Sequence, residues 1–316
     1  KIRKNKMMNN YNKLNNILGW SVFTIASFVY LSTIEQTVSF WDCGEYISTA
    51  YKLEVGHPPG APLFQLFGRI FSLFATPGTS QVAIAINIMS ALCSSLTILF
   101  LFWTITAFGR KLFAKSEEMD SGKMYAVLGS GLVGALTYTF SDSFWFSAVE
   151  GEVYAMSSFF TAITFWCIMK WEREADQPHA SRWLVLIAYL IGLSVGVHLL
   201  SLLTIPAMGM IYYYKNYEYS KMGAIKAFII SMVLLGIVQG VIIPMVVSLI
   251  SSFEFTTRIP FPPPPFAALI ITGNFTLSIN SLILSISLVS LSPGTVGTLF
   301  CTIIFFASIL LPIIAI

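Results

Sequence analysis

Long apolar runs separated by shorter polar segments dominate the pattern of this chain. A helix needs roughly 20 apolar residues to cross a hydrocarbon core about 30 Å thick. The pattern therefore predicts an all-α membrane protein that crosses the bilayer several times. The expected spans are about 17–34, 82–108, 125–140, 153–171 and 228–250, followed by two less regular ones at about 267–291 and 295–316.

The stretch from Trp183 to Lys215 is also apolar, but it is too long for a single crossing. Gly192, Gly196, His198 and Pro206 interrupt its middle. Glycine and proline weaken or end helices. We therefore expect two short helices that form a hairpin and turn near His198.

Composition narrows the class of protein. Of the 316 residues, 56% are hydrophobic and only 10% are charged, and the mean hydropathy is +0.76. An ordinary soluble domain carries about 25% charged residues. These values exclude a soluble enzyme, a disordered chain and a disulfide scaffold. The sequence also contains no Walker glycine loop, no His/Cys cluster of the metal-binding type and no basic patch of the nucleic-acid-binding type.

The positions of the few basic residues predict the topology. Fifteen of the 18 Lys and Arg residues lie before residue 18 or in the segments 110–123, 170–182 and 215–226. Short loops rich in Lys and Arg stay on the cytoplasmic side of a membrane. The N-terminus is therefore predicted inside, and the hairpin at 183–215 is needed because both of its flanks are basic. The loops 35–81, 141–152 and 251–266 are predicted outside.

Acidic residues show the opposite bias. Eight of the 15 Asp and Glu residues lie in the predicted outer loops, and the loop 141–152 has three acids and no base. Two outer loops would thus bring carboxylates to one membrane face. A general base acting on a lipid-borne substrate needs such an arrangement. The alternative is that these acids only hydrate the outer surface.

The segment 40–60 reads FWDCGEYISTAYKLEVGHPPG and is too polar to cross the membrane. Asp42 and Glu45 share one face of a helix, and Asp42 also suits a helix N-cap. His57 opens a rigid Pro-Pro-Gly turn. After the turn, about 62–75 predicts a second interfacial helix, whose Arg69 could bind a lipid phosphate or extend to the head groups.

These elements resemble the polytopic glycosyltransferases of the GT-C fold. The closer resemblance is to a family long catalogued as a domain of unknown function, widespread in Bacteroidetes and related to a eukaryotic protein O-mannosyltransferase. Four motifs carry it in order, over about residues 15–215. They are Asp42-Cys43-Gly44-Glu45-Tyr46, His57-Pro58-Pro59-Gly60 with Pro62-Leu63, Glu152-Val153-Tyr154 and Gly192-Leu193-Ser194-Val195-Gly196-Val197-His198.

The resemblance implies a helical bundle of GT-C type with interfacial helices in the first outer loop. Residues 1–250 would form the catalytic membrane core, and 251–316 would be further transmembrane segments of a truncated C-terminal part. It also implies catalytic roles for Asp42 as general base, Glu45 and Glu152. The substrate-binding candidates are Tyr46, His57, Arg69, Glu150 and His198. His198 could instead be a packing residue with one hydrogen bond, and Cys43 is interpreted as incidental.

By the same resemblance, the donor would be a sugar, with mannose as the candidate, linked to a polyprenyl phosphate. The acceptor would be a hydroxyl group of an exported protein or glycan. Other expected partners are membrane lipids but no nucleic acid. No metal ligand is assigned, although two carboxylates could hold a divalent cation. The expected location is the bacterial inner membrane, with the site on the periplasmic face. A transporter or flippase for a lipid-linked or anionic substrate, or an inactive scaffold, remains the alternative.

Overall fold

The computed structural model describes residues 2–57, 60–75, 81–114, 120–246 and 248. This part of the chain is helical and contains no strand. The longer helices are α1 (Ile2–Ser32), α4 (Val82–Ala114), α5 (Ser121–Thr139), α7 (Val153–Glu174), α8 (Ser181–Val195), α9 (Thr204–Asn216) and α10 (Lys221–Ile237). The shorter elements are α2 (Cys43–Lys52), α3 (Pro62–Ser72), α6 (Asp142–Ala148), the 3-10 helix η2 (Leu199–Leu203) and the π-helical turn η3 (Val238–Ile242).

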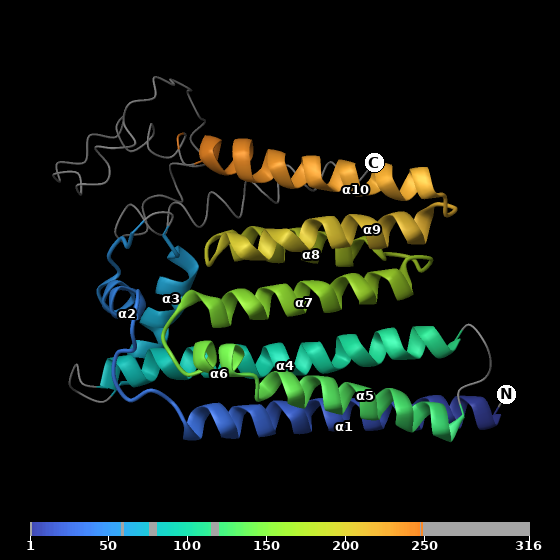
Figure 1. The fold of residues 1–316 in the computed structure, drawn as a ribbon, viewed down its shortest axis with the longest axis horizontal. Helices are drawn as coiled ribbons and strands as arrows, with labels where there is room; N and C mark the ends of the chain where they lie inside the picture. The colour runs from blue at the N-terminus through green and yellow to red at the C-terminus, as the bar shows by residue number, and fades with distance from the viewer. Residues whose placement is uncertain (1, 58–59, 76–80, 115–119, 247, 249–316) are drawn as a thin grey trace.

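The long helices lie side by side in one bundle, and α2 and α3 cover one end of it (Figure 1). Helix α4 packs against α1, α5 and α7, while α7 packs against α8 and α9, and α9 packs against α10. Four helical stretches are long and apolar enough to cross a membrane, and these are Met7–Ser32, Val82–Phe113, Val153–Glu174 and Lys221–Val246. Within the described residues, the prediction of an all-α membrane protein is therefore confirmed.

Several helices extend beyond the predicted spans. Helix α1 begins at Ile2 rather than near residue 17, and α4 continues to Ala114. Hydropathy marks only the part of a helix that would lie in lipid, so polar turns at its end escape the pattern. The predicted loop 141–152 contains α6, whose Trp145 donates Nε1–H to Thr33 Oγ1 at 2.9 Å. The predicted spans 267–291 and 295–316 and the loop 251–266 lie outside the described residues.

The predicted hairpin is confirmed. Helices α8 and α9 are joined by a turn at 196–203, in which His198 caps the short helix η2. The turn lies at the end of the bundle that α2 and α3 cover, because the backbone N–H of Leu63 donates to the Gly196 carbonyl at 2.8 Å. This bond also satisfies one of the donors that a helix leaves unpaired at its N-terminus.

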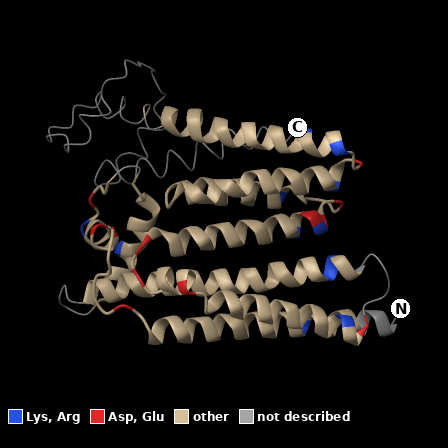
Figure 2. Ribbon diagram, in the orientation of Figure 1, with Lys and Arg blue, Asp and Glu red and all other residues tan. Residues whose placement is uncertain are grey.

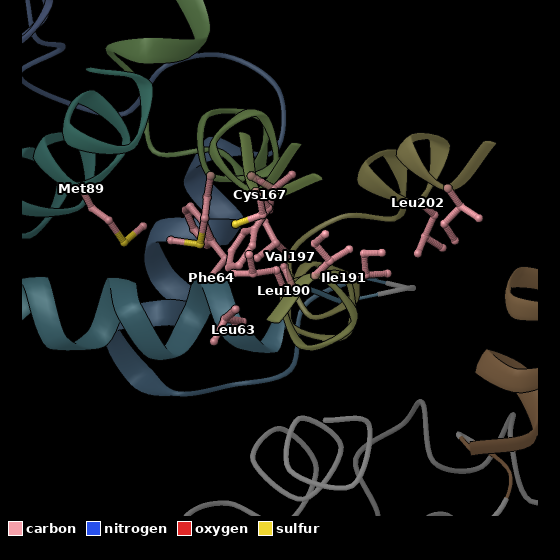
Figure 3. Packing of buried hydrophobic residues seen from close by; sticks show 14 of the residues in the cluster. Leu63, Phe64, Met89, Cys167, Leu190, Ile191, Val197 and Leu202 are labelled. Carbon is pink, nitrogen blue, oxygen red and sulfur yellow. The ribbon is translucent and has the colours of Figure 1, made fainter. Parts of the chain in front are cut away.

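Two apolar clusters hold the helices together. The larger joins α2, α3, α4 and α7 to the hairpin, and the smaller joins α1, α4, α5 and α6. Figure 3 labels Phe64 of α3, Leu190 of α8 and Val197 of the turn, which all belong to the larger cluster. Phe64 has no exposed surface. Since burial of a Phe side chain is worth about 1.5–3 kcal/mol, α3 is held firmly on the bundle.

Charged residues lie mainly at the two ends of the bundle (Figure 2). At the end where α1 begins, bases pair with acids of neighbouring segments, as in Lys111–Glu172, between α4 and α7, at 2.8 Å and Lys215–Asp176, between α9 and the loop after α7, at 2.7 Å. At the opposite end, acids gather around α2 and the start of α7. This second end carries the candidate residues of the outer loops.

Candidate functional site

Hydrogen bonds tie the first long loop to the rest of the bundle. The buried Asn87 of α4 donates from Nδ2 to the carbonyls of Glu35, at 2.8 Å, and Thr37, at 3.2 Å. The backbone N–H of Glu35 donates to the carbonyl of Val149, which follows α6, at 3.2 Å. The segments 33–57 and 141–152, far apart in the sequence, therefore meet at the same end of the bundle.

Helix α2 presents Asp42 to solvent. Asp42 occupies the N-cap position, but its side chain makes no capping hydrogen bond and is 55% exposed. The preceding Trp41 has φ of 61°, in the left-handed region that bulky residues rarely adopt. Such strained residues are concentrated at functional sites. Because the Asp42 carboxylate does not make the capping hydrogen bond that its position suggested, it remains available to other groups.

His57 lies between the two acids of the first motif. Glu45 accepts hydrogen bonds from the backbone N–H of His57 and, at Oε2, interacts with its ring Nδ1 at 3.0 Å. The other ring nitrogen, Nε2, lies 3.9 Å from Asp42 Oδ2. When Nδ1 carries the proton and donates to Glu45, Nε2 is left as an acceptor beside the Asp42 carboxylate. The backbone N–H of Gly60 donates to the His57 carbonyl at 2.8 Å.

Tyr46 forms the wall of this group. Its ring packs edge-on against His57, at 5.7 Å between centroids, and against Phe64, at 5.5 Å. Burial and the nearby carboxylates of Asp42, Glu152 and Glu45 raise the pKa of Tyr46 to about 12. Its hydroxyl therefore stays protonated and can donate a hydrogen bond to a bound ligand.

A second group lies beneath the first and is buried. The side chains of Cys43, Glu150 and Glu152 each offer a ligand atom, and these atoms lie within 4.8 Å of one another. Burial, followed by the charges of Glu150 and Asp42, raises the pKa of Glu152 to about 7. Burial also raises the pKa of Glu150, although hydrogen bonds from Ser39 and Cys43 oppose this shift. Two carboxylates that both resist ionisation thus share a small volume.

Arg69 and His198 lie at the edges of the site. Arg69 donates from Nη1 to the Tyr51 carbonyl at 2.9 Å and stacks over the Tyr51 ring at 5.2 Å, which places it near the C-terminal end of α2. His198 accepts a hydrogen bond at Nδ1 from the backbone N–H of Leu200 at 3.1 Å. Its ring lies 5.4 Å from that of Tyr154, one of the motif residues. Both side chains therefore have structural bonds in addition to any role with a ligand.

Three residues at this end escaped the sequence interpretation. Cys43, interpreted as incidental, is 1% exposed and lies against the two glutamates. Asn87 and Gln65 are buried polar residues in helices of apolar character, and each has a side-chain atom without a hydrogen-bond partner among the described residues. An amide side chain within an apolar run could have identified Asn87 and Gln65 as candidate site residues, because burying an unpaired polar group is unfavourable.

Comparison with known proteins identifies a matching family model and related proteins. Residues 42–221 match the model of the "Protein O-mannosyl-transferase TMEM260 N-terminal domain". The chain is 29% identical over 195 residues to the protein O-mannosyl-transferase tmem260 of Dictyostelium discoideum, which covers 58% of this chain and 22% of that protein. It is 24% identical over 176 residues to the corresponding mouse protein, covering 55% and 22%. No solved structure matches.

The chain thus aligns with only about a fifth of the length of these relatives. The matched region nevertheless begins at Asp42 and extends past the hairpin, so it includes all the motif residues described above. Because this match covers more than half of the chain, the protein belongs to the family of the protein O-mannosyl-transferase TMEM260 N-terminal domain.

Proposed function

We propose that this chain is the membrane core of a glycosyltransferase that moves a sugar from a polyprenyl-phosphate donor to a hydroxyl group of a protein or glycan. Mannose is the sugar suggested by the names of the relatives. The observation that carries the proposal is the group of Asp42, Glu45 and His57, which lies exposed at the end of the bundle where acids gather. A donor held in the membrane by its lipid would present its sugar at such an end.

In the proposed reaction, Asp42 acts as the general base. The acceptor oxygen forms a bond to the anomeric carbon, the bond from that carbon to the phosphate oxygen breaks, and the hydroxyl proton goes to the Asp42 carboxylate. Because Glu45 holds the His57 ring by Nδ1, His57 Nε2 lies 3.9 Å from Asp42 Oδ2. An acceptor hydroxyl that donates its one proton to Asp42 would be positioned by that hydrogen bond, as a general base requires.

The leaving phosphate needs a cation or hydrogen-bond donors. Arg69 is the proposed ligand, since its bonds to Tyr51 and Ser72 both leave from Nη1 and a guanidinium has five N–H donors. Tyr46 and His198 would contact the sugar or the lipid phosphate from either side. Glu152, with Glu150 beside it, would be the second acid of the site, buried close enough to Asp42 that the Asp42 charge contributes to its raised pKa.

The proposed topology follows from the distribution of charge. The basic end of the bundle, which holds the N-terminus, would face the cytoplasm, and the acidic end would face the other side of the membrane. The acceptor would then be an exported protein or glycan. The bacterial inner membrane stays a prediction, and the two relatives named above are eukaryotic.

The decisive experiment compares two Asp variants in the same acidic end. Purified protein in detergent would be assayed with polyprenyl-phosphate mannose and a peptide rich in Ser and Thr. Asp42→Asn should lower the rate by about 10²–10⁴, the usual contribution of a general base. Asp142→Asn is the matched control, because Asp142 is exposed in the first turn of α6 and outside the proposed site.

The outcomes separate the parts of the proposal. Transfer by the wild-type protein and by Asp142→Asn, but not by Asp42→Asn, supports both the reaction and the base. A fully active Asp42→Asn variant would remove Asp42 from that role. If the wild-type protein transfers no sugar from any polyprenyl-phosphate donor while binding one, the glycosyltransferase assignment itself is wrong, and a transporter becomes the better hypothesis.

A further inference from the structure

The buried group below Asp42 has the composition of a cation site. Cys43 is 1% exposed, Glu150 3% and Glu152 8%, and their ligand atoms lie within 4.8 Å of one another. They come from two segments, the start of α2 and the turn that precedes α7. The exposed group of Asp42, Glu45 and His57 has similar spacing, but there Glu45 already uses both carboxylate oxygens on His57.

Unpartnered oxygens provide an independent reason to expect a ligand. Glu150 Oε2 is buried and has no hydrogen-bond partner in the described part of the chain. Asn87 Oδ1, from α4, is likewise buried and without a partner. It points at Gly151, between the two glutamates, since a Cβ on that glycine would lie 2.8 Å from it. Leaving a buried oxygen without a hydrogen-bond partner is unfavourable, and more so when the group is charged.

Charge leads to the same conclusion. Two charged carboxylates in a buried volume repel each other. Among the described residues, neither Glu150 nor Glu152 has a hydrogen bond or ion pair with a Lys or Arg side chain. A divalent cation would neutralise both. We propose that Cys43, Glu150 and Glu152 bind one divalent transition-metal cation of the Zn²⁺ type, with Asn87 Oδ1 or a water as the fourth ligand. On binding, the thiol of Cys43 would release its proton to solvent, and the sulfur would bind as thiolate.

The ligand set favours this class of cation over Mg²⁺ or Ca²⁺. Those cations take oxygen ligands, whereas Zn²⁺ and Co²⁺ accept sulfur together with carboxylates. In a tetrahedral site with bonds of about 2.0–2.3 Å, ligand atoms lie roughly 3.3–3.8 Å apart. The present spacing of at most 4.8 Å reaches that value after a shift of about 1 Å, which side-chain rotation can supply.

The cation would have a positioning role. Cys43 directly follows Asp42 and is the first residue of α2, whereas Glu150 and Glu152 precede α7. One cation would therefore fasten the segment that carries Asp42 to the bundle. This inference does not depend on the proposed function, because metal binding can be measured without any sugar transfer.

The test uses Co²⁺ as a spectroscopic probe. The full chain, purified in detergent and freed of metal by a chelator, would be titrated with Co²⁺ and Zn²⁺. We expect one equivalent per chain, and an absorption band in the near ultraviolet from charge transfer between thiolate and Co²⁺. Cys43→Ser should abolish the band, and Glu152→Gln should weaken binding by more than tenfold. Cys93→Ser is the matched control, because Cys93 lies in α4, outside this group, and its band should be unchanged.

Each result decides the question. A band that survives Cys43→Ser, or a wild-type chain that binds no more metal than the Glu150→Gln/Glu152→Gln variant, overturns the proposal. If Cys43→Ser fails to fold, the conservative Glu152→Asp variant gives the answer through its metal affinity. Asp42→Asn should bind metal normally even if it transfers no sugar, so failure of the metal site and failure of the proposed function can be told apart.

Discussion

Gly151 offers the sharpest test of how the site is built, because it separates the two buried glutamates and allows no side chain. A Cβ at this position would lie 2.8 Å from Asn87 Oδ1 and 3.0 Å from Ile47 Cγ1. Real Cβ contacts are longer, so Gly151→Ala must displace the Asn87 side chain, the Ile47 side chain or the turn itself. Its φ is outside the left-handed region, so the effect would be steric and not a matter of backbone strain.

The size of the effect follows from what holds Asn87 in place. Its side chain cannot rotate away without losing hydrogen bonds to the carbonyls of Glu35 and Thr37, each worth about 1 kcal/mol. Overpacking against Ile47 adds about 1–3 kcal/mol. We therefore expect Gly151→Ala to lower the free energy of unfolding by about 3–5 kcal/mol, or the thermal midpoint by roughly 6–10 °C at about 2 °C per kcal/mol.

The assay is thermal unfolding of purified protein in detergent, with Gly129→Ala as the control. Gly129 lies within α5, and a Cβ there meets nothing within 4 Å, so alanine should leave the midpoint unchanged or raise it slightly. A double variant, Gly151→Ala with Asn87→Ala, should be more stable than the sum of the single changes predicts, because the second change removes the clash with Asn87 Oδ1 and leaves only the contact with Ile47. If Gly151→Ala melts like the control, the three segments do not pack as described.

Three further predictions concern single residues of the site. Glu45→Ala removes both hydrogen bonds that hold His57 and should reduce the rate of sugar transfer by about 10²-fold. The control is Glu54→Ala, at an exposed position, which should leave this rate unchanged. Equal transfer rates for the two variants would show that His57 needs no support from Glu45. Arg69→Met should raise KM for the donor more than it lowers kcat if Arg69 binds phosphate, and a loss of thermal stability with unchanged KM would assign it to packing alone. His198 should make the stability depend on pH. Burial lowers the pKa of His198, so the folded state binds fewer protons than the unfolded state. The contribution of His198 to the free energy of unfolding is therefore present above about pH 6.5 and is lost as the pH falls. His198→Asn keeps an N-cap acceptor and should remove this dependence in melting curves recorded across that range.

Much of the bundle could be predicted from the sequence because lipid-spanning helices have a simple physical signature. Apolar length located α4 and α7, and the hairpin of α8 and α9 followed from a stretch too long for one crossing, interrupted by Gly and Pro and flanked by basic residues on both sides. The signature fails where no lipid is involved. The polar start of α1, from Ile2, and the seven-residue helix α6 are helical because of local hydrogen bonds and packing. A hydropathy profile records neither.

The site was predictable in part. The spacing of Asp42 and Glu45 predicted that they share one helix face, and the motifs marked His57 only as a substrate-binding candidate. The structure adds that His57 lies between the two acids, within hydrogen-bonding or ion-pair range of each. Arg69 could not be placed, since a lone Arg in an apolar helix has no fixed direction, and the structure bonds it to Tyr51. The meeting of Cys43 with Glu150 depends on contacts between residues over one hundred positions apart, which no local pattern contains.

The adjacency of Asp42 and Cys43 explains why the exposed and buried groups should act together. Successive residues at the start of a helix point in directions about 100° apart, so one can face solvent while the next faces the core. Here Asp42 faces His57, and Cys43 faces the two glutamates. Any force that fixes the Cys43 side chain therefore also fixes the backbone that carries Asp42. Because about 1 Å of misplacement can cost 10²-fold in rate, the buried group would control catalysis by the exposed one without touching the substrate.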